Sequence, residues 1–542
     1  MELYAVFAFI LALFLSMVMI PPLVRLAGPL HLVDMGGERK IHRGSVPRIG
    51  GVAIVVGSLI PILLWVPLDR FHAAFTAAVI LLFVFGLLDD RFNIDYRLKL
   101  LGQILAASIV VAVGGVLIEE VPLSLGGTLP AFVAVPLTII ALAGFTNAVN
   151  LSDGLDGLAG GIALLAISAL LILLIADAGT DGSILVVLTA LGGSILGFLR
   201  FNSFPARLFM GDTGSQFLGF STGVLAIAIT QREDLALSPL LPLLVLGLPI
   251  LDTLTVMVRR MARGQSPFKA DRTHLHHRLI DAGLNQAEAV SLIYLAQFVL
   301  SILAYVLRHH HDFTILIVYG VFCLILLTGI HWLEHRYRIL TARGDRRRSF
   351  IRLGAWARKN RPTALWPVRF LRIIVPVTLV SGALLAPAVE MDIGLLASGL
   401  LCVTALFLVV KPLGFLFIEQ LVAFTTAVIL VYAVAHSPAL RVCPICIGTV
   451  LGLITLSGAL WVRLSSSRFQ VSALDLLILL GALTAPTLRG LGLQTLGIQA
   501  LSAIVLFYAI EILMQERTRA WDGLRIGILS TLAVVAYKSL MA

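Results

Sequence analysis

Residues 147–176 read NAVNLSDGLDGLAGGIALLAISALLILLIA, so a polar stretch leads directly into a continuous apolar run. The apolar part, residues 158–176, has about the length that a helix needs to cross the hydrocarbon core of a bilayer. Similar runs recur throughout the chain, which is 59% hydrophobic and only 13% charged. A soluble α/β protein would need more polar surface, and the runs are too long for the strands of a membrane β-barrel. The sequence therefore predicts an all-α integral membrane protein, a polytopic helical bundle.

The apolar runs fall into two groups separated by a basic stretch. The first run, near residues 2–20, lacks a basic start and a small-residue cleavage site, which favours a retained helix over a signal peptide. We expect a membrane domain over residues 1–335, a basic cytoplasmic linker over 336–371 and an additional C-terminal membrane module, of unassigned role, over 372–542. That module should hold about seven transmembrane helices. The first domain should hold about eleven, near residues 3–26, 49–67, 73–88, 99–117, 130–146, 158–176, 183–200, 215–230, 239–260, 287–307 and 313–333.

The basic residues lie in alternate short loops. The formal net charge of +10 would suggest nucleic acid in a soluble protein, but in a membrane protein it reports topology, so no nucleic-acid partner is expected. Loops with Arg39, Lys40 and Arg48, and the loop after the ninth run, are predicted to be cytoplasmic. The N-terminus is then expected on the other side of the membrane.

Four polar segments fall on the predicted cytoplasmic side. They are Asp89–Asp90 after the third run, the stretch from Asn147 after the fifth, RFNSFPARLFMGDTGSQ (200–216) after the seventh and SPFKADRTHLHHRL (266–279) after the ninth. Any one of them could be a solvated helix end. Four at the same membrane level, with no comparable sets in the outward loops, indicate one site at the cytoplasmic surface.

The residue types in these segments point to phosphate chemistry with a hard metal ion. Paired carboxylates and a third aspartate, Asp212, are ligands suited to Mg²⁺ or Mn²⁺ rather than zinc. The GDTGS segment precedes a helix and offers backbone N–H groups to an anion beside that metal. His276 and His277 are adjacent and do not share a helix face. Binding of a phosphate or nucleotide is therefore favoured for the histidine run over metal ligation or a solvated surface.

The stretch after the fifth run places polar side chains at steps of three. Such steps keep neighbours adjacent on one slowly turning helix face. Amides and carboxylates there could read a hydrogen-bonding edge or complete a metal shell, and the glycines would permit close approach. The four residues of this expected helical ladder are Asn147, Asn150, Asp153 and Asp156.

These motifs resemble those of the polyprenyl-phosphate N-acetylhexosamine-1-phosphate transferases, integral membrane enzymes of the glycosyl transferase family 4 type. The resemblance rests on the Asp89–Asp90 pair, NAVNLSDGLDGL, FMGDTGS and DRTHLHHR, and on RKIHRGSVPRIGG near the N-terminus. It covers roughly residues 1–335. The HLHH form resembles the branch that uses UDP-N-acetylglucosamine, whereas the muramoyl-peptide branch has a different histidine run.

The resemblance implies a reaction. N-Acetylglucosamine 1-phosphate, or a related N-acetylhexosamine 1-phosphate, would pass from a UDP-sugar to undecaprenyl phosphate, with release of UMP. The product would start a lipid-linked cell-envelope glycan, such as lipopolysaccharide O-antigen, at the cytoplasmic face of the bacterial inner membrane. Membrane lipids would surround the enzyme, and a homodimer is left open.

The resemblance also implies roles for individual residues. Asp89 and Asp90 would be catalytic, with Asp89 as the proton acceptor for the lipid phosphate, and direct attack by that phosphate is favoured over a covalent intermediate. Asp212 and Asn150 would hold Mg²⁺ (or Mn²⁺). The implied substrate-binding residues are Lys99, Asn147, Asp153, Asp156, Asn202, His274, His276, His277 and Arg278.

A transporter or lipid flippase is the alternative reading. It predicts charged groups deep within helices, whereas the charges here mostly lie at one face. Asp252, inside the ninth run and close to Pro249, is the main exception. We expect it to support another helix rather than to hold the metal.

Few polar groups distinguish the C-terminal module. Lys411, Glu419 and Asp475 are isolated there, which favours a scaffold or partner contact. Cys443 and Cys446 form a CPIC segment that could be a local disulfide or two plain thiols.

Overall fold

A computed structural model describes most of the chain. The described residues are 2–35, 45–120, 128–177, 182–232, 235–266, 273–342, 366–387, 391–410, 415–435, 444–464, 494–515 and 523–541. Nearly all of them are helical, and ten of the described helices are long and apolar enough to cross a membrane. The predicted fold class, an all-α multi-pass membrane protein, is confirmed.

The chain forms two compact units, one over Met1–Gly344 and one over Asp345–Val471 and Ile478–Ala542. Each has a hydrophobic core of its own. The helix that ends the first unit continues to Ala342, inside the segment expected to be a linker, and residues 343–365 of that segment lie outside the described residues.

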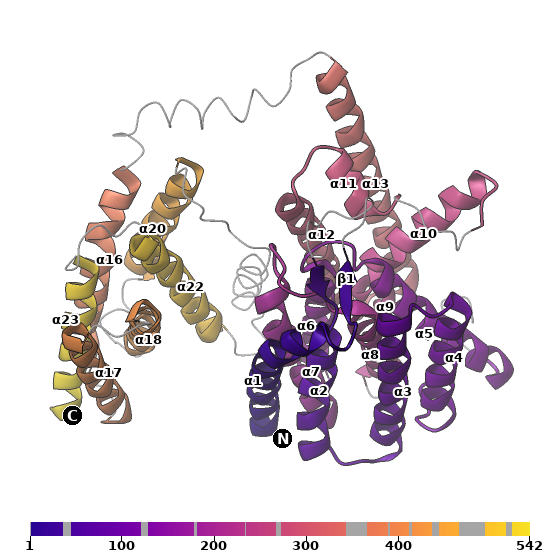
Figure 1. Ribbon diagram of the computed structural model, residues 1–542, viewed down its shortest axis with the longest axis horizontal. Coiled ribbons are helices and arrows are strands. Elements are labelled where there is room, and N and C mark those ends of the chain that lie inside the picture. Colours follow the sequence, from indigo (N-terminus) through magenta and orange to yellow (C-terminus); the bar gives the residue numbers. More distant parts are fainter. Residues whose placement is uncertain are drawn as a thin grey trace. The chain divides into compact units, whose positions relative to one another are not determined.

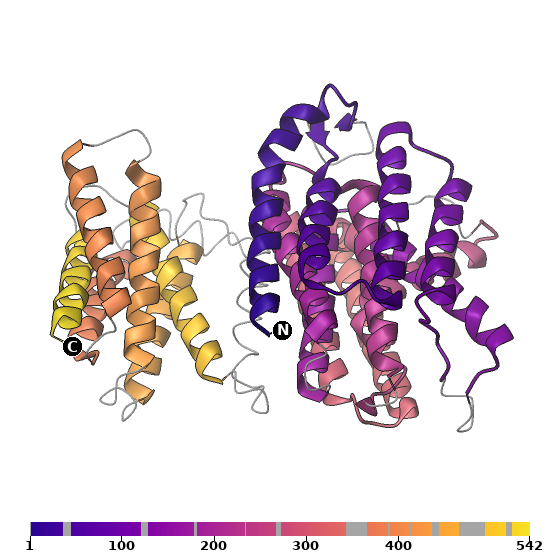
Figure 2. The ribbon, with the colours of Figure 1, turned by 90° about the horizontal axis from the view of Figure 1, so that it is seen from below.

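Eleven long helices build the described part of the first unit, at the positions that the apolar runs predict (Figures 1 and 2). Two short helices, α9 (Leu241–Val245) and α11 (Leu275–Asp281), accompany them. The long helices are α1 (Glu2–Ala27), α2 (Gly50–Trp65), α3 (Arg70–Phe92), α4 (Tyr96–Ala112), α5 (Ala131–Leu151), α6 (Leu158–Asp177), α7 (Gly182–Asn202), α8 (Gly211–Thr230), α10 (Gly247–Ala262), α12 (Gln286–Val306) and α13 (Asp312–Ala342).

The ninth apolar run is two helices rather than the one expected. The chain breaks at Leu246, between α9 and α10, just before Pro249. Proline has no N–H to donate to the carbonyl four residues earlier, that of Val245. The side chain of Gln297 on α12 donates to this carbonyl instead, at 2.8 Å. A partner on a neighbouring helix thus permits the break at membrane depth.

Helix α8 is the centre of the first unit. Nearly every residue from Thr213 to Thr230 is buried, and α2, α3, α5 and α6 pack around it. Glycines make the closest approaches possible. A Cβ on Gly51 of α2 would collide with the backbone of Gly214, and one on Gly86 of α3 would collide with the backbone of Thr213. The start of α8 is therefore held against two other helices.

The N-terminal loop is tied to the segment before α8. Two short antiparallel strands, β1 (Val33–Met35) and β2 (Ser45–Pro47), form a hairpin above the bundle. Phe209 donates its N–H to the carbonyl of Pro47 at 2.7 Å, and Gly50 returns a bond to the carbonyl of Phe209 at 2.9 Å. These bonds fix where α2 and α8 begin.

The second unit is described over six helices. Glu419, expected to be isolated, instead forms a buried ion pair with Arg525, whose guanidinium donates at 2.6 and 3.0 Å to its two carboxylate oxygens. Lys411, Asp475, Cys443 and the side chain of Cys446 lie outside the described residues. The helices are α16 (Trp366–Leu385), α17 (Met391–Val410), α18 (Phe415–Ala435), α20 (Pro444–Leu464), α22 (Gln494–Gln515) and α23 (Gly523–Leu540).

Candidate active site

Two aspartates and a lysine meet where α3 ends and where α4 and α8 begin. Lys99 Nζ lies 2.5 Å from Asp89 Oδ2 and 2.6 Å from Asp212 Oδ2. Asp89 is buried, whereas the side chains of Lys99 and Asp212 keep 27% and 29% of their exposure. We call these residues the Asp89–Lys99–Asp212 cluster. Its lysine and one carboxylate can be reached from outside the bundle, while the other carboxylate is reached through them.

Asp90 faces the first turn of α8. Its carboxylate accepts the backbone N–H of Asp212 at 2.8 Å and that of Thr213 at 3.0 Å, and the Thr213 hydroxyl donates to it at 2.5 Å. Backbone N–H groups in the first turn of a helix have no intrahelical partner, and a carboxylate there also favours the helix dipole. Asp90 thus fixes the backbone of Asp212.

Amides from α4, α5 and α8 form a layer next to the cluster. Asn150 Nδ2 donates to Asp212 Oδ1 and to Ser215 Oγ, both at 2.8 Å. One turn earlier on α5, Asn147 Nδ2 donates to Gln103 Oε1 at 2.6 Å, and Gln103 in turn donates to Gln216 Oε1 at 3.2 Å. The structure therefore brings Asn150 to Asp212, as predicted, and places Asn147 in the next layer.

The expected helical ladder is wrong beyond Asn150. Helix α5 ends at Leu151, and Asp153 and Asp156 lie in turns before α6. Gly157 has a φ of +79°, in the left-handed region that favours glycine and that a helix cannot contain. Its N–H and carbonyl bond to side chains from elsewhere, Asn202 Oδ1 at 2.9 Å and the Tyr294 hydroxyl at 2.6 Å. Glycine and these partners end the helix that spacing alone predicts.

Asp156 and Asn202 join this turn to the segment before α8. Asp156 Oδ2 accepts the N–H of Ala206 at 2.9 Å, and Asn202 Nδ2 donates to the carbonyl of Leu208 at 2.8 Å. Both side chains are only 2% exposed. Because their polar atoms serve the loops, the contacts of these two predicted substrate-binding residues are with protein backbone.

Asp153 lies between the loops and the cluster. Partial burial, together with the charges of Asp90 and Asp156, raises the pKa of the Asp153 carboxyl to about 7, although Arg48 opposes the shift. Arg48 reaches this position from the N-terminal loop, where it also forms a 2.8 Å ion pair with Asp34. An acid with such a pKa can exchange a proton near neutral pH.

The histidine run packs against the same turn. His274 Nδ1 lies 3.0 Å from Asp252 Oδ2, and Asp252 Oδ1 accepts the N–H of Leu275 at 2.7 Å. Asp252 thus supports the histidine segment, which is the structural role expected for it. The His276 ring lies over Gly154, since a Cβ on that glycine would collide with the ring. Burial, reinforced by His277, lowers the pKa of His276 to about 3, so its imidazole is neutral.

Arg278 points to another helix. Its guanidinium donates to both carboxylate oxygens of Glu334 on α13, at 2.7 and 3.2 Å. The side chain is 6% exposed. His277, the fourth member of the run, contacts the His276 ring at 4.2 Å between centroids. The described contacts of Arg278 therefore anchor the histidine segment to α13.

The donor set of the cluster fits a magnesium ion. Among the described residues no three acidic, histidine or cysteine side chains gather as a metal-binding group. Mg²⁺, however, needs only one or two carboxylates, since it keeps waters and takes phosphate oxygens from its substrate. Asp212 is partly exposed, with Asn150 beside it. Asp89 Oδ1 is buried and has no hydrogen-bond partner among the described residues, as a spare ligand oxygen would.

Several residues at the site escaped sequence reasoning. Gln103 lies four positions after Lys99, and Gln216 lies four positions after Asp212, so each is one helical turn from a predicted site residue. That spacing was a usable signal. Arg48 and Thr213 had none, because their importance comes from contacts with remote parts of the chain.

Comparison with known proteins identifies the family. The model of glycosyl transferase family 4 matches residues 72–230, which include the whole Asp89–Lys99–Asp212 cluster. The chain is 35% identical over 307 residues to a probable undecaprenyl-phosphate N-acetylglucosaminyl 1-phosphate transferase of Bacillus subtilis, a match that covers 56% of this chain and 85% of that protein. The chain belongs to glycosyl transferase family 4.

Other members of glycosyl transferase family 4 match the same part of the chain. A decaprenyl-phosphate N-acetylglucosaminephosphotransferase of Mycolicibacterium smegmatis is 37% identical over 287 residues, which are 48% of this chain and 71% of that protein. An undecaprenyl-phosphate alpha-N-acetylglucosaminyl 1-phosphate transferase of Yersinia pestis is 31% identical over 287 residues, 52% of this chain and 78% of that protein. The predicted family and its N-acetylglucosamine 1-phosphate branch are confirmed.

Proposed function

We propose that the chain transfers N-acetylglucosamine 1-phosphate, or a related N-acetylhexosamine 1-phosphate, from a UDP-sugar to undecaprenyl phosphate and releases UMP. The relatives named above act on undecaprenyl or decaprenyl phosphate according to their names. The observation that carries the proposal is the Asp89–Lys99–Asp212 cluster at one end of a membrane helix bundle. A lipid phosphate and a water-soluble nucleotide can meet there.

The proposed step is a phosphoryl transfer. An oxygen of the lipid phosphate attacks the phosphorus that carries the sugar. The bond from that phosphorus to the bridging oxygen breaks, and UMP leaves with the electron pair. Both reactants are anionic, so catalysis needs positive charge and fixed donors around the reacting oxygens.

Lys99 is the fixed cation of the site. Its ammonium is partly exposed and reaches both carboxylates of the cluster, so a phosphate that enters would find it already oriented. Asp212 with Asn150, and Asp89 behind them, would hold Mg²⁺ (or Mn²⁺), which supplies charge neutralisation at the phosphate oxygens when bound. Asp89 would also accept the proton that a singly ionised lipid phosphate still carries.

The remaining residues position these groups. Asp90 holds the start of α8, and the turn with Asp153 and Asp156 lies beside it. The neutral imidazole of His276 can donate or accept one hydrogen bond at the sugar or diphosphate but brings no charge. The basic loops favour the cytoplasmic face of a bacterial inner membrane as the side where this occurs.

Purified full-length protein with undecaprenyl phosphate, Mg²⁺ and a panel of UDP-sugars tests the proposal. UMP should be released fastest with UDP-N-acetylglucosamine among the panel. EDTA and the substitution Asp212→Asn should each stop the release. If UMP appeared at the same rate under both conditions, the metal assignment would be wrong. If no UDP-sugar gave UMP or lipid-linked sugar, the reaction itself would be wrong.

A further inference from the structure

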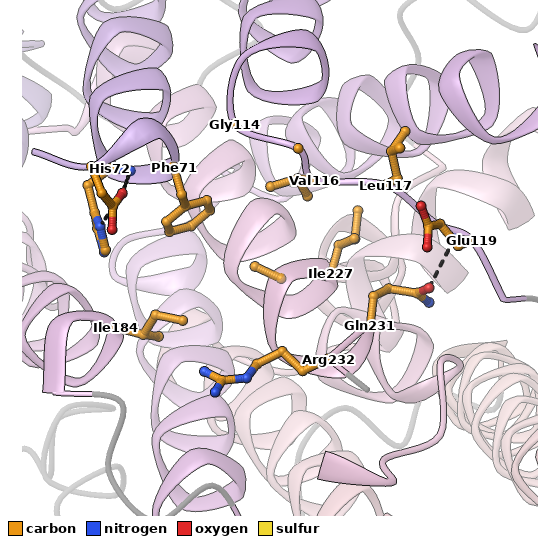
Figure 3. Close-up of a pocket in the computed structure, with 13 residues that line it drawn as sticks. Phe71, His72, Gly114, Val116, Leu117, Glu119, Ile184, Ile227, Gln231 and Arg232 are labelled. Carbon is orange, nitrogen blue, oxygen red and sulfur yellow. Dashed lines mark hydrogen bonds and ion pairs between the residues drawn. The ribbon is translucent and has the colours of Figure 1, made fainter. Parts of the chain in front are cut away.

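A cavity lies at the end of the first unit away from the Asp89–Lys99–Asp212 cluster. It has a volume of about 390 Å³, within the range of small-ligand sites. The start of α3, the segment after α4, the start of α7 and the end of α8 line it (Figure 3).

The helices that line the cavity also run to the cluster. Helix α3 has His72 in the cavity and Asp89 in the cluster, and α8 begins with Asp212 and ends at the cavity, next to Gln231. At 1.5 Å per residue, the stretch of α3 between its two sites is about 25 Å long. That distance approaches the thickness of a bilayer core, so the cavity belongs to the opposite membrane face.

A buried histidine points to a ligand in this cavity. His72 is only 4% exposed, and its Nε2 has no hydrogen-bond partner among the described residues. Its Nδ1 lies 2.9 Å from Asp69 Oδ1, which already accepts the backbone N–H of His72 as the cap of α3. A buried polar atom without a partner costs free energy, which a ligand oxygen could recover.

The charges of the cavity lie apart. Figure 3 shows the His72 ring and the Arg232 guanidinium on one side of Ile227 and the Glu119 carboxylate on the other. The side chain of Gln231 accepts the backbone N–H groups of Glu119 and Glu120, at 3.0 and 3.1 Å, which holds this loop in place. The cavity therefore offers a basic end and an acidic end.

Apolar surface lies between and beside these ends. Phe71, Val116 and Ile227 line the cavity. Leu68 and Val113, each adjacent in sequence to a lining residue, are 61% and 48% exposed. In a membrane protein such side chains face lipid, so an acyl chain could continue outward from the cavity along them.

We propose that this cavity binds the headgroup of a zwitterionic phospholipid with a primary amine, as in phosphatidylethanolamine. The phosphate would lie toward Arg232 and His72, and the ammonium toward Glu119. An anionic headgroup without an amine would leave Glu119 without a counter-charge. A choline headgroup has no N–H to donate to that carboxylate.

Native mass spectrometry of the full-length protein, released from vesicles with equal amounts of phosphatidylethanolamine, phosphatidylglycerol and phosphatidylcholine, tests the proposal. Phosphatidylethanolamine should be retained preferentially. Arg232→Gln and Glu119→Gln should each weaken its retention by about tenfold, the effect of one charge-assisted hydrogen bond. Arg70→Gln makes the same charge change at the start of α3 without lining the cavity, so it should retain the lipid.

Three results would overturn the proposal. Equal retention of the three lipids would show that no headgroup is recognised. Phosphatidylglycerol retained best, with loss on Arg232→Gln but not on Glu119→Gln, would mean a site for anionic phosphate instead. An equal loss in Arg70→Gln would mean a general surface-charge effect. Circular dichroism and size-exclusion profiles of each variant separate loss of binding from loss of fold.

Discussion

Lys99 Nζ lies 2.6 Å from Asp212 Oδ2, although the two residues are 113 positions apart in the chain. The same ammonium holds Asp89, so one cation neutralises two carboxylates from two other helices. A buried carboxylate without a counter-charge is costly. Lys99 therefore stabilises the cluster as well as offering charge to a phosphate.

Replacing Lys99 by methionine should separate these two roles. The variant keeps much of the side-chain volume but leaves Asp89 and Asp212 without their cation. We expect a loss of about 1–3 kcal/mol in the free energy of unfolding, less than for a fully buried pair because Lys99 and Asp212 are partly exposed. Thermal unfolding in detergent with EDTA measures it.

Mg²⁺ should then stabilise Lys99→Met more than the wild type, since two carboxylates without a cation attract the metal. Arg91→Met, an exposed cation near the end of α3, is the matched control and should show neither effect. A variant that melts like the wild type in EDTA would contradict the counter-ion role.

Asp90 should behave as a positioning residue. Asp90→Ala removes the acceptor for three donors in the first turn of α8, so we expect a loss of stability of about 1–2 kcal/mol, typical of a lost helix cap. UMP release should fall because Asp212 is no longer held. Asp90→Asn keeps one acceptor oxygen and should retain part of both properties.

Metal affinity distinguishes this role from catalysis. Mn²⁺ binding, measured by electron paramagnetic resonance, should weaken in Asp90→Ala and partly recover in Asp90→Asn. Asp90→Asn with wild-type stability and Mn²⁺ affinity but no activity would instead make Asp90 a catalytic residue.

Asp252 should act through His274. Asp252→Asn keeps the shape but can present an N–H where the histidine now has a carboxylate, which would change the favoured imidazole tautomer. We expect kcat/KM for UMP release to fall by about tenfold, as for one hydrogen bond to a charged group, with Mn²⁺ affinity unchanged. If Asp252 bound the metal, Mn²⁺ affinity would drop with the activity.

His276 should make the fold sensitive to acid. Its pKa is about 3 in the folded protein and about 6.5 in the unfolded chain, so the unfolded state binds the proton more readily between these values. Stability is therefore lost as pH falls from about 6.5 toward 3. The melting temperature of His276→Gln should decline less than that of the wild type between pH 6.5 and 4.5.

His310→Gln, at an exposed histidine, is the control for this measurement and should follow the wild-type curve. The same decline in His276→Gln and wild type would assign acid sensitivity to other groups.

The fold was largely predictable, with failures at particular places. Apolar length determines the membrane helices, so their positions agreed with the runs in the first unit. The break at Leu246 could be suspected from Pro249, but the break depends on Gln297 from another helix. The helical ladder failed because a spacing of three is compatible with a helix without requiring one, and Gly157 and its partners favour a turn.

By itself, the sequence determined which segments enter the membrane and which polar residues remain at their ends, because burial of apolar side chains in lipid depends on composition and length. It also determined the family, through motifs at matched spacing. Only the tertiary structure decided which of those polar groups meet. Lys99 with Asp89 and Asp212, Asp90 with the start of α8, Asp252 with His274 and Arg278 with Glu334 are each set by helix packing. Hydrogen bonds and ion pairs act over about 3 Å, a distance that positions in a chain do not encode.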